Sequence, residues 1–421
     1  MLTQNKFLPW IVCFSAALFF FYEFIQMNMF NAISHSLMRD FSIDATQLGK
    51  LSAIYFYANV LFLPVAGSLL DRFSTRRMIL ITMFLCAVGI GIFALSHSIL
   101  LSSIARFMSG IGSAFCFLSS MRLASRWFPA QRMALVSGLI VTMAMIGGMV
   151  AQTPLTLLTG ILGWRHALLL DSLLGFAIIG VVWVFVRDYP PGVVPSPHLQ
   201  AELKSLGLLR SLRMSYLNIQ NWLCALYTSL LDLPIALLGA IWGSLYLVQV
   251  EHLTPIQASY VTTMLFLGTV IGGPLLGWFS DRVGRRKIPM IITAILSLLI
   301  LCIIMYVTHL SLTSYLILFF LLGFITAAQV ISYPLVAESN PAILTATSVS
   351  VVSLACMGSF AVFQPIFGWL MDLKWHGQMI DNVRIYSAAD YQRAFLIILV
   401  GFLVALACSF FLRETFCRRS D

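Results

Sequence analysis

Three charged residues lie deep inside long apolar segments of the 421-residue sequence: Glu23, Arg106 and Asp232. A charge in an apolar environment costs free energy, so such residues usually bind protons, ions or polar solutes, or pair with one another. A buried carboxyl group can take up and release a proton, and we expect Glu23 or Asp232 to do so. Arg106 is expected to modulate these acids or to bind an anion. The competing interpretation of each acid is a structural salt bridge between helices.

Polar and aromatic side chains lie near these charges at the three- and four-residue spacing of a helix face. Some share a segment with a charge, and others lie in neighbouring apolar segments. Each could instead serve helix–helix packing. The candidates for a solute-binding cavity are Tyr22, Gln26, Asn31, Tyr55, Asn59, Ser113, Gln152, Thr228, Trp242, Gln329, Tyr333 and Gln364. Two further acids, Asp171 and Glu338, are expected at the membrane interface, near helix ends.

The segments that hold these residues are predicted to be membrane-spanning helices. Sixty per cent of the residues are hydrophobic and 10% are charged, whereas soluble domains carry roughly 25% charged residues. A spanning helix needs about 20 predominantly apolar residues. This criterion predicts twelve helices, near 7–36, 46–70, 77–96, 98–126, 132–160, 165–186, 219–249, 255–279, 287–308, 311–335, 343–371 and 391–413.

The longest polar stretch, 188–217, is predicted to be a cytoplasmic linker between an N-terminal bundle, 1–187, and a C-terminal bundle, 218–421. It is expected to include an amphipathic surface helix around 198–213. Of the 25 Lys and Arg residues, we assign 18 to the side of the N-terminus, six to the other side and Arg106 to the membrane. Because cytoplasmic loops are enriched in Lys and Arg, both termini are predicted to be cytoplasmic, in a bacterial inner membrane.

The two halves share an internal repeat. The pattern Pro-x-x-Gly-x-x-x-Asp-Arg-x-x-x-Arg begins at Pro64 and recurs at Pro274, with an offset of 210 at every position. A weaker pairing at offset 212 relates Gln152 to Gln364. The repeats fall at the same place in each half, as expected of parallel repeats in a transporter.

These motifs resemble those of the major facilitator superfamily. Residues 277–287 fit the loop Gly-x-x-x-Asp-Arg-x-Gly-Arg-Arg/Lys, and the first copy departs from it at Ser74 and Thr75. Arg106 begins a second family pattern, Arg-x-x-x-Gly-x-Gly. The resemblance implies an all-α membrane fold with two pseudo-symmetric six-helix bundles and a cavity lined by helices one, four, seven and ten. It links Arg106 to proton coupling and implies a cytoplasmic gate at Gly67, Asp71, Arg72, Arg76, Gly277, Asp281, Arg282 and Arg286.

The predicted function is secondary active transport, proton-coupled, of a small polar organic solute such as an amino acid, a short peptide or an organic acid. Efflux of drug-like or siderophore-like compounds is one alternative, although helix five lacks the Gly-Pro-x-x-Gly-Gly typical of drug antiporters. A non-transporting membrane sensor is another. The sequence has no P-loop and no His-Glu-x-x-His motif, and its cysteines lack metal-ligand spacing. We therefore expect a monomer that is not an enzyme, with no metal, cofactor or nucleic-acid partner.

Overall fold

The computed structural model describes residues 7–129, 132–191, 208–307, 310–341, 345–380 and 383–417. Twelve helical segments in this part of the chain are long and apolar enough to cross a membrane. The predicted twelve spans are confirmed.

Eight spans are single helices in the described residues: α3 (Ala45–Arg72), α4 (Thr75–Leu95), α5 (Ile99–Trp127), α8 (Trp164–Phe185), α13 (Pro255–Val283), α14 (Lys287–Tyr306), α17 (Thr345–Asp372) and α18 (Ala388–Phe411). The other four are interrupted. Span one is α1 (Leu8–Asn28) with α2 (Phe30–Phe41), and span five is α6 (Met133–Val150) with α7 (Thr153–Leu162). Span seven runs through α11 (Ile219–Leu231), the π-helix η2 (Pro234–Trp242) and α12 (Gly243–Gln249). Span ten runs through α15 (Leu312–Thr326), the 3₁₀-helix η3 (Ala327–Ile331) and α16 (Ser332–Glu338).

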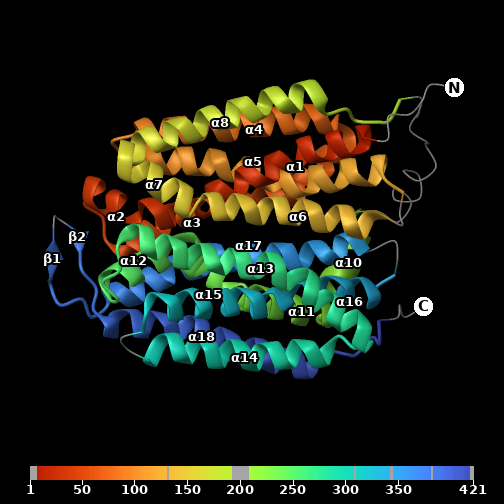
Figure 1. Ribbon diagram of the computed structural model, residues 1–421. Helices are drawn as coiled ribbons and strands as arrows, with labels where there is room; N and C mark the ends of the chain where they lie inside the picture. The colour runs from red at the N-terminus through yellow and green to blue at the C-terminus, as the bar shows by residue number, and fades with distance from the viewer. Residues whose placement is uncertain are drawn as a thin grey trace.

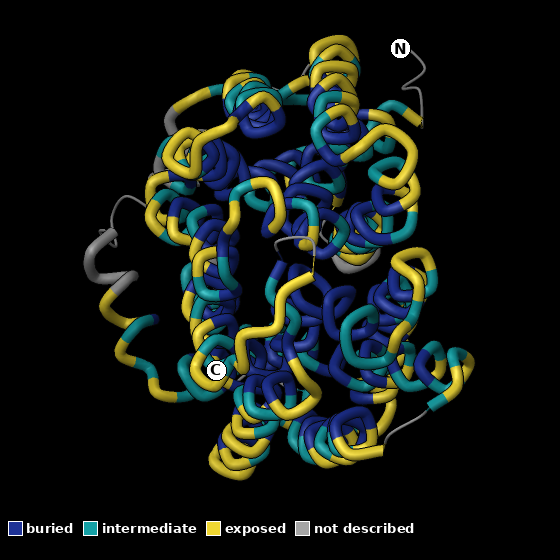
Figure 2. Tube along the Cα trace, turned by 90° about the vertical axis from the view of Figure 1, so that its left-hand side faces the viewer, coloured by how far each residue is buried: buried dark blue, intermediate teal, exposed yellow. Residues whose placement is uncertain are grey.

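The spans form two pseudo-symmetric six-helix bundles. In Figure 1 the first six spans, coloured red to yellow, lie above the last six, coloured green to blue. Helix α1 begins and α18 ends at one end of the molecule, here called the termini end. The opposite end, the hairpin end, carries the antiparallel strands β1 (Met379–Ile380) and β2 (Val383–Arg384). Figure 2 shows buried residues inside each bundle and exposed residues around the rim. The exposed residues include large apolar ones such as Ile161 and Phe411.

The repeat extends to the signals that start the second span of each bundle. The Asp44 carboxylate caps α3 by accepting from the backbone N–H of Gln47, and the Gln47 side chain accepts from the Asp44 N–H. Thr254 and Gln257 make the same capping box at the start of α13. The offset is again 210, since 254 − 44 = 210. Such reciprocal bonds satisfy N–H groups that a helix start leaves unpaired.

Several span bounds differ by a few residues from the sequence prediction, most of all the end of span one. Span one continues to Phe41 instead of residue 36, because the chain resumes the helix after a break at Met29. The amphipathic helix expected around 198–213 falls partly outside the described residues. The part that the structure describes, α10 (Leu208–Leu217), is helical.

Candidate functional site

Glu23 lies in the interior of the N-terminal bundle. Its side chain on α1 is 1% exposed, and its Oε2 accepts a hydrogen bond of 2.9 Å from the Tyr55 hydroxyl on α3. Its Oε1 has no hydrogen-bond partner among the described residues. That oxygen faces Gly112 of α5, where a Cβ would lie only 2.9 Å from it. The glycine of the Arg-x-x-x-Gly-x-Gly pattern therefore makes room for a carboxyl group.

Arg106 lies beside this carboxyl group and is fully buried. Its Nη1 donates to the backbone oxygen of Gln26 at 2.9 Å and its Nη2 to that of Ser52 at 3.4 Å. The guanidinium carbon is 4.6 Å from the ring centre of Phe30 and 4.7 Å from that of Tyr55. Tyr55 thus contacts both charged residues, stacking on Arg106 and donating to Glu23.

Asp171 corrects the sequence analysis. It was expected near a helix end at the membrane interface, but it is only 7% exposed and its Oδ2 accepts from Gln26 Nε2 at 2.6 Å. The side chain points inward because α8 buries a stripe that includes Ala167, Asp171 and Gly175 at helical spacing. This stripe of small residues was the sequence signal that could have placed Asp171 in the site.

The acid of the C-terminal bundle occupies a different environment. Asp232 directly follows α11 and lies two residues before the start of the π-helix η2, and its Oδ1 accepts a 2.7 Å hydrogen bond from Gln329 of η3. The pair therefore joins the two irregular segments of spans seven and ten. Asp232, Gln329 and Tyr333 are half-buried. Thr228, one turn before Asp232, is fully buried.

The two glutamines related by the repeat both bind η2. Gln364 of α17 donates to the carbonyl of Ala236 at 2.9 Å, and Gln152 donates to the carbonyl of Gly239 at 3.0 Å. Asn31 of α2 donates to Gln152 Oε1 at 2.5 Å and accepts from the backbone N–H of Ser244 at 2.8 Å. Asn31 and Gln152 therefore connect the two bundles in this conformation.

The remaining cavity candidates also pack inside the bundles. Asn59 donates to Ser113 at 2.6 Å between α3 and α5. Trp242 is fully buried and stacks on Phe367 at 5.7 Å, and the buried Tyr22 hydroxyl faces Gly175. All of the twelve candidates are buried except the half-buried pair in span ten, described above. Within the described residues, no hydrogen bond or ion pair joins the acid of one bundle to that of the other.

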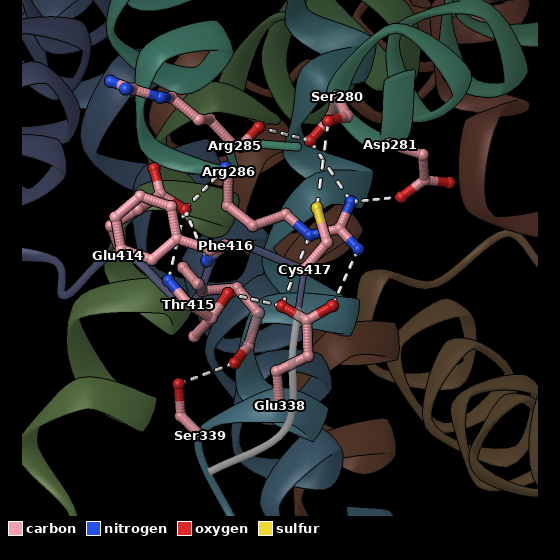
Figure 3. Close-up of polar contacts among 11 residues, drawn as sticks. Ser280, Asp281, Arg285, Arg286, Glu338, Ser339, Glu414, Thr415, Phe416 and Cys417 are labelled. Atoms are coloured by element: carbon pink, nitrogen blue, oxygen red, sulfur yellow. Dashed lines mark hydrogen bonds and ion pairs between the residues drawn. The ribbon is translucent and has the colours of Figure 1, made fainter. Parts of the chain in front are cut away.

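The predicted gate residues lie at the termini end. Figure 3 shows Arg286 between Asp281 and Glu338, at 2.6 Å and 2.7 Å. Burial alone would lower the pKa of the Arg286 guanidinium, but its hydrogen bonds to Glu338 and Asp281 raise the pKa above its usual value. These partners belong to the same bundle as Arg286.

The chain after α18 folds against this cluster. Glu414 accepts from the backbone N–H groups of Arg286 and Lys287, at 2.8 Å and 2.9 Å, and so caps the start of α14. Burial alone would raise the pKa of the Glu414 carboxyl, but its hydrogen bonds to the N–H groups of Arg286, Lys287, Phe416 and Thr415 hold the pKa below its usual range.

The other gate residues make local contacts. Arg76 donates to the carbonyl of Trp183, and Arg282 stacks over Trp278 at 5.2 Å. A Cβ added at Gly67 or at Gly277 would meet no described atom within 4 Å. The side chains of Asp71 and Arg72 lie outside the described residues.

The hairpin end joins the bundles through Asp372, the last residue of α17. Its carboxylate accepts from the backbone N–H and the hydroxyl of Thr46, at 2.7 Å and 2.5 Å, at the start of α3. Tyr386 and Arg384 donate to the same carboxylate, at 2.7 Å and 3.1 Å. The polar contacts that Asn31, Gln152 and Asp372 make between the bundles all lie in the hairpin-end half of the molecule.

Comparison with known proteins finds transporters. The family model of the Major Facilitator Superfamily matches residues 13–250 and 224–419. The chain is 24% identical over 320 residues to a probable galactarate/D-glucarate transporter of Bacillus subtilis (strain 168), covering 68% of this chain and 70% of that protein. It is 26% identical over 296 residues to a hexuronate transporter of Escherichia coli (strain K12), covering 65% and 67%.

Among solved structures, the chain resembles a bacterial homologue of the human lysosomal transporter Spinster in an inward-facing, unoccupied conformation. The TM-score is 0.80 with 16% identity, covering 99% of this chain and 100% of that one. At this identity the likeness concerns the fold.

Proposed function

The chain belongs to the Major Facilitator Superfamily, a family of transporters, and we propose that it couples the movement of a small organic acid to protons by alternating access. The observation that carries this proposal is the buried Glu23 carboxyl group, which has one unpartnered oxygen among the described residues and lies with Arg106 between α1, α3 and α5. A carboxyl group that is buried in one state and hydrated in another can exchange a proton between the two sides.

The proposed direction of opening follows from the positions of the Lys and Arg residues. With both termini cytoplasmic, the hairpin end faces outward. This end is closed by the contacts of Asn31, Gln152 and Asp372, which corresponds to an inward-facing state. In this proposal, the gate clusters at the termini end contact the opposite bundle only after the two bundles rotate relative to each other. The membrane that we propose for this topology is the bacterial inner membrane.

The proposed solute is a sugar acid or a related organic acid. Two relatives are named as transporters of such acids. The half-buried group of Asp232, Gln329 and Tyr333 offers an amide and a hydroxyl for sugar hydroxyl groups. A proton on Asp232 would remove the negative charge that repels an anionic solute. Binding of the proton and binding of the solute would therefore favour each other.

The test is uptake into proteoliposomes under an imposed pH gradient. We expect wild-type protein to accumulate radiolabelled D-galacturonate when the outside is acidic. Glu23→Gln and Asp232→Asn should lose accumulation by about tenfold or more, the effect of removing a positioned proton carrier. Glu251→Gln, which changes an acid outside the spans, should behave like wild type.

Several outcomes would decide between the functions. Full accumulation in both variants would overturn the assignment of the proton carrier. Uptake of D-galactose or of glycyl-alanine in preference to D-galacturonate would overturn the solute class. Extrusion of a lipophilic dye with no uptake of any of these solutes would favour efflux.

A further inference from the structure

A second acid shares the interior of the N-terminal bundle with Glu23. Asp171 on α8 reaches the cluster through Gln26, which lies three residues after Glu23 on α1 and donates to Asp171 at 2.6 Å. Gln26 is fully buried and Asp171 is 7% exposed. The proposed function assigns no role to Asp171.

The cluster contains two carboxyl groups and, among the described residues, one guanidinium. Arg106 donates to the carbonyls of Gln26 and Ser52, and within the described residues no ion pair joins it to either acid. The other titratable groups that face the acids are uncharged when protonated: Tyr22 on α1, Tyr55 on α3, Cys86 on α4 and Cys116 on α5. Two ionised carboxyl groups would leave a net negative charge in a buried site, which is strongly unfavourable. The cluster is neutral when one carboxyl group holds a proton.

The hydrogen bonds of the cluster indicate the same need for a proton. Glu23 Oε1, Gln26 Oε1 and the Tyr22 hydroxyl are buried without a hydrogen-bond partner in the described part of the chain. The amide oxygen of Gln26 can only accept a hydrogen bond. The same holds for the Glu23 oxygen while the acid is ionised. A carboxylate is purely an acceptor, whereas a carboxylic acid is also an O–H donor. The Tyr22 hydroxyl is the one donor among these three groups, and a proton on Glu23 adds a second donor.

We propose that Asp171 and Glu23 together bind one exchangeable proton, with Gln26 holding the two acids in position. This inference rests on the proposed function for its role in transport. When water reaches the cluster, the carboxylic O–H bond breaks, the proton passes to water, and the two carboxylates share the charge of Arg106. When the cluster closes, one proton returns.

Infrared spectroscopy tests the inference without a solute. Purified full-length protein is titrated, and the carbonyl stretch of protonated carboxyl groups is followed in difference spectra. We expect Glu23 and Asp171 to contribute two titration steps in wild type, in addition to the steps of Asp232 and the other acids. Asp171→Asn and Glu23→Gln should each leave one step, displaced by about one pH unit or more, because interacting groups titrate as a pair.

The control and a second variant keep the test decisive. Ser172→Ala removes the neighbouring buried side chain, whose hydroxyl donates to the carbonyl of Ala87, and should leave both steps unchanged. Gln26→Leu should keep both acids but bring their steps closer together. A wild-type spectrum in Asp171→Asn, or single steps that do not move, would overturn the inference.

A transport measurement on Asp171→Asn separates this inference from the proposed function. Asp171→Asn should lose accumulation of D-galacturonate driven by a pH gradient by at least about tenfold and keep its solute exchange without a gradient. Absence of all D-galacturonate transport in wild type would count against the proposed solute alone, since the infrared result stands without it.

Discussion

At the scale of the residue, Arg106 is fixed more firmly than a surface charge would be. It is fully buried, donates to two backbone carbonyls and stacks on Phe30 and Tyr55. A planar guanidinium can make all of these contacts at once, whereas a lysine ammonium is a point charge on a flexible stem. The position therefore demands arginine and not merely a positive charge.

We predict that Arg106→Lys lowers the free energy of unfolding by about 2 kcal/mol, the size of a desolvated cation–π contact, and lowers transport of D-galacturonate. Thermal denaturation in detergent and proteoliposome uptake measure the two effects. Arg126→Lys is the control, since Arg126 stacks over Tyr189 at 4.3 Å but its side chain keeps 15% exposure. Equal losses in both variants would refute the role of burial.

At the scale of the element, span seven is held in an irregular shape by side chains from both bundles. Pro234 begins η2 and has no N–H to continue the preceding helix. The π-helical carbonyls of Ala236 and Gly239 accept from Gln364 and Gln152. The repeat thus places one glutamine from each bundle on the same segment, which suits a segment that must change its contacts when the bundles move.

We predict that Gln364→Leu increases hydrogen exchange in η2, because the variant leaves a buried carbonyl without its donor at a cost of about 1–3 kcal/mol. Mass spectrometry of peptides covering 234–242 measures the exchange. The control, Gln220→Leu, removes an amide that donates to the carbonyl of Phe411 at the termini end. Unchanged exchange in η2 would show that Gln364 does not support it.

The cap that Glu414 forms on α14 makes the stability of the fold depend on pH. The lowered pKa of Glu414 means that its cap on α14 stabilises the fold at pH values above the ordinary carboxyl pKa of about 4.3. That stability is lost as the pH falls through the lowered pKa of the folded state.

We predict that Glu414→Gln melts at a lower temperature than wild type at pH 7, and that the difference shrinks progressively as the pH falls below about 4. Thermal denaturation across this range measures it. Arg413→Gln, a change at the preceding exposed residue, should show no such pH dependence. A difference between wild type and Glu414→Gln that persists in acid would contradict the cap.

Much of this architecture could be predicted from the sequence, because lipid imposes simple rules. Apolar length located the twelve spans, and the repeat beginning at Pro64 and Pro274 indicated two like bundles. The cost of burying charge singled out Glu23, Arg106 and Asp232. Asp171 was misplaced because its distance from the end of an apolar segment was used instead of the stripe that α8 buries. The contacts between the bundles depend on tertiary packing and have no local sequence signal.

At the scale of the whole molecule, the two bundles are joined at one end by a few polar groups. Asp372 is central to them, since its carboxylate receives two hydrogen bonds from Thr46 of the other bundle. Interfaces of this kind have two discrete arrangements, and small changes in free energy shift the populations between them. The strength of this contact should set how often the hairpin end opens.

We predict that Asp372→Asn opens the hairpin end more often, because the amide weakens the charge-assisted bonds from Thr46 and Arg384. A cysteine introduced at Ser244, in a background without the native cysteines, should react faster with a membrane-impermeant maleimide. Asp40→Asn is the control, since Asp40 binds Arg39 and Trp164 within its own bundle. Equal reactivity in wild type and Asp372→Asn would remove the proposed role of this contact.

The central claim is that solute and proton cross together, and simultaneous measurement of both fluxes tests it most directly. Proteoliposomes containing a trapped pH-sensitive dye receive external D-galacturonate with no imposed gradient. The account predicts acidification of the interior that accompanies uptake in wild type and is absent in Glu23→Gln. Uptake of the solute by wild type with no change in internal pH, under conditions that dissipate the membrane potential, would contradict it.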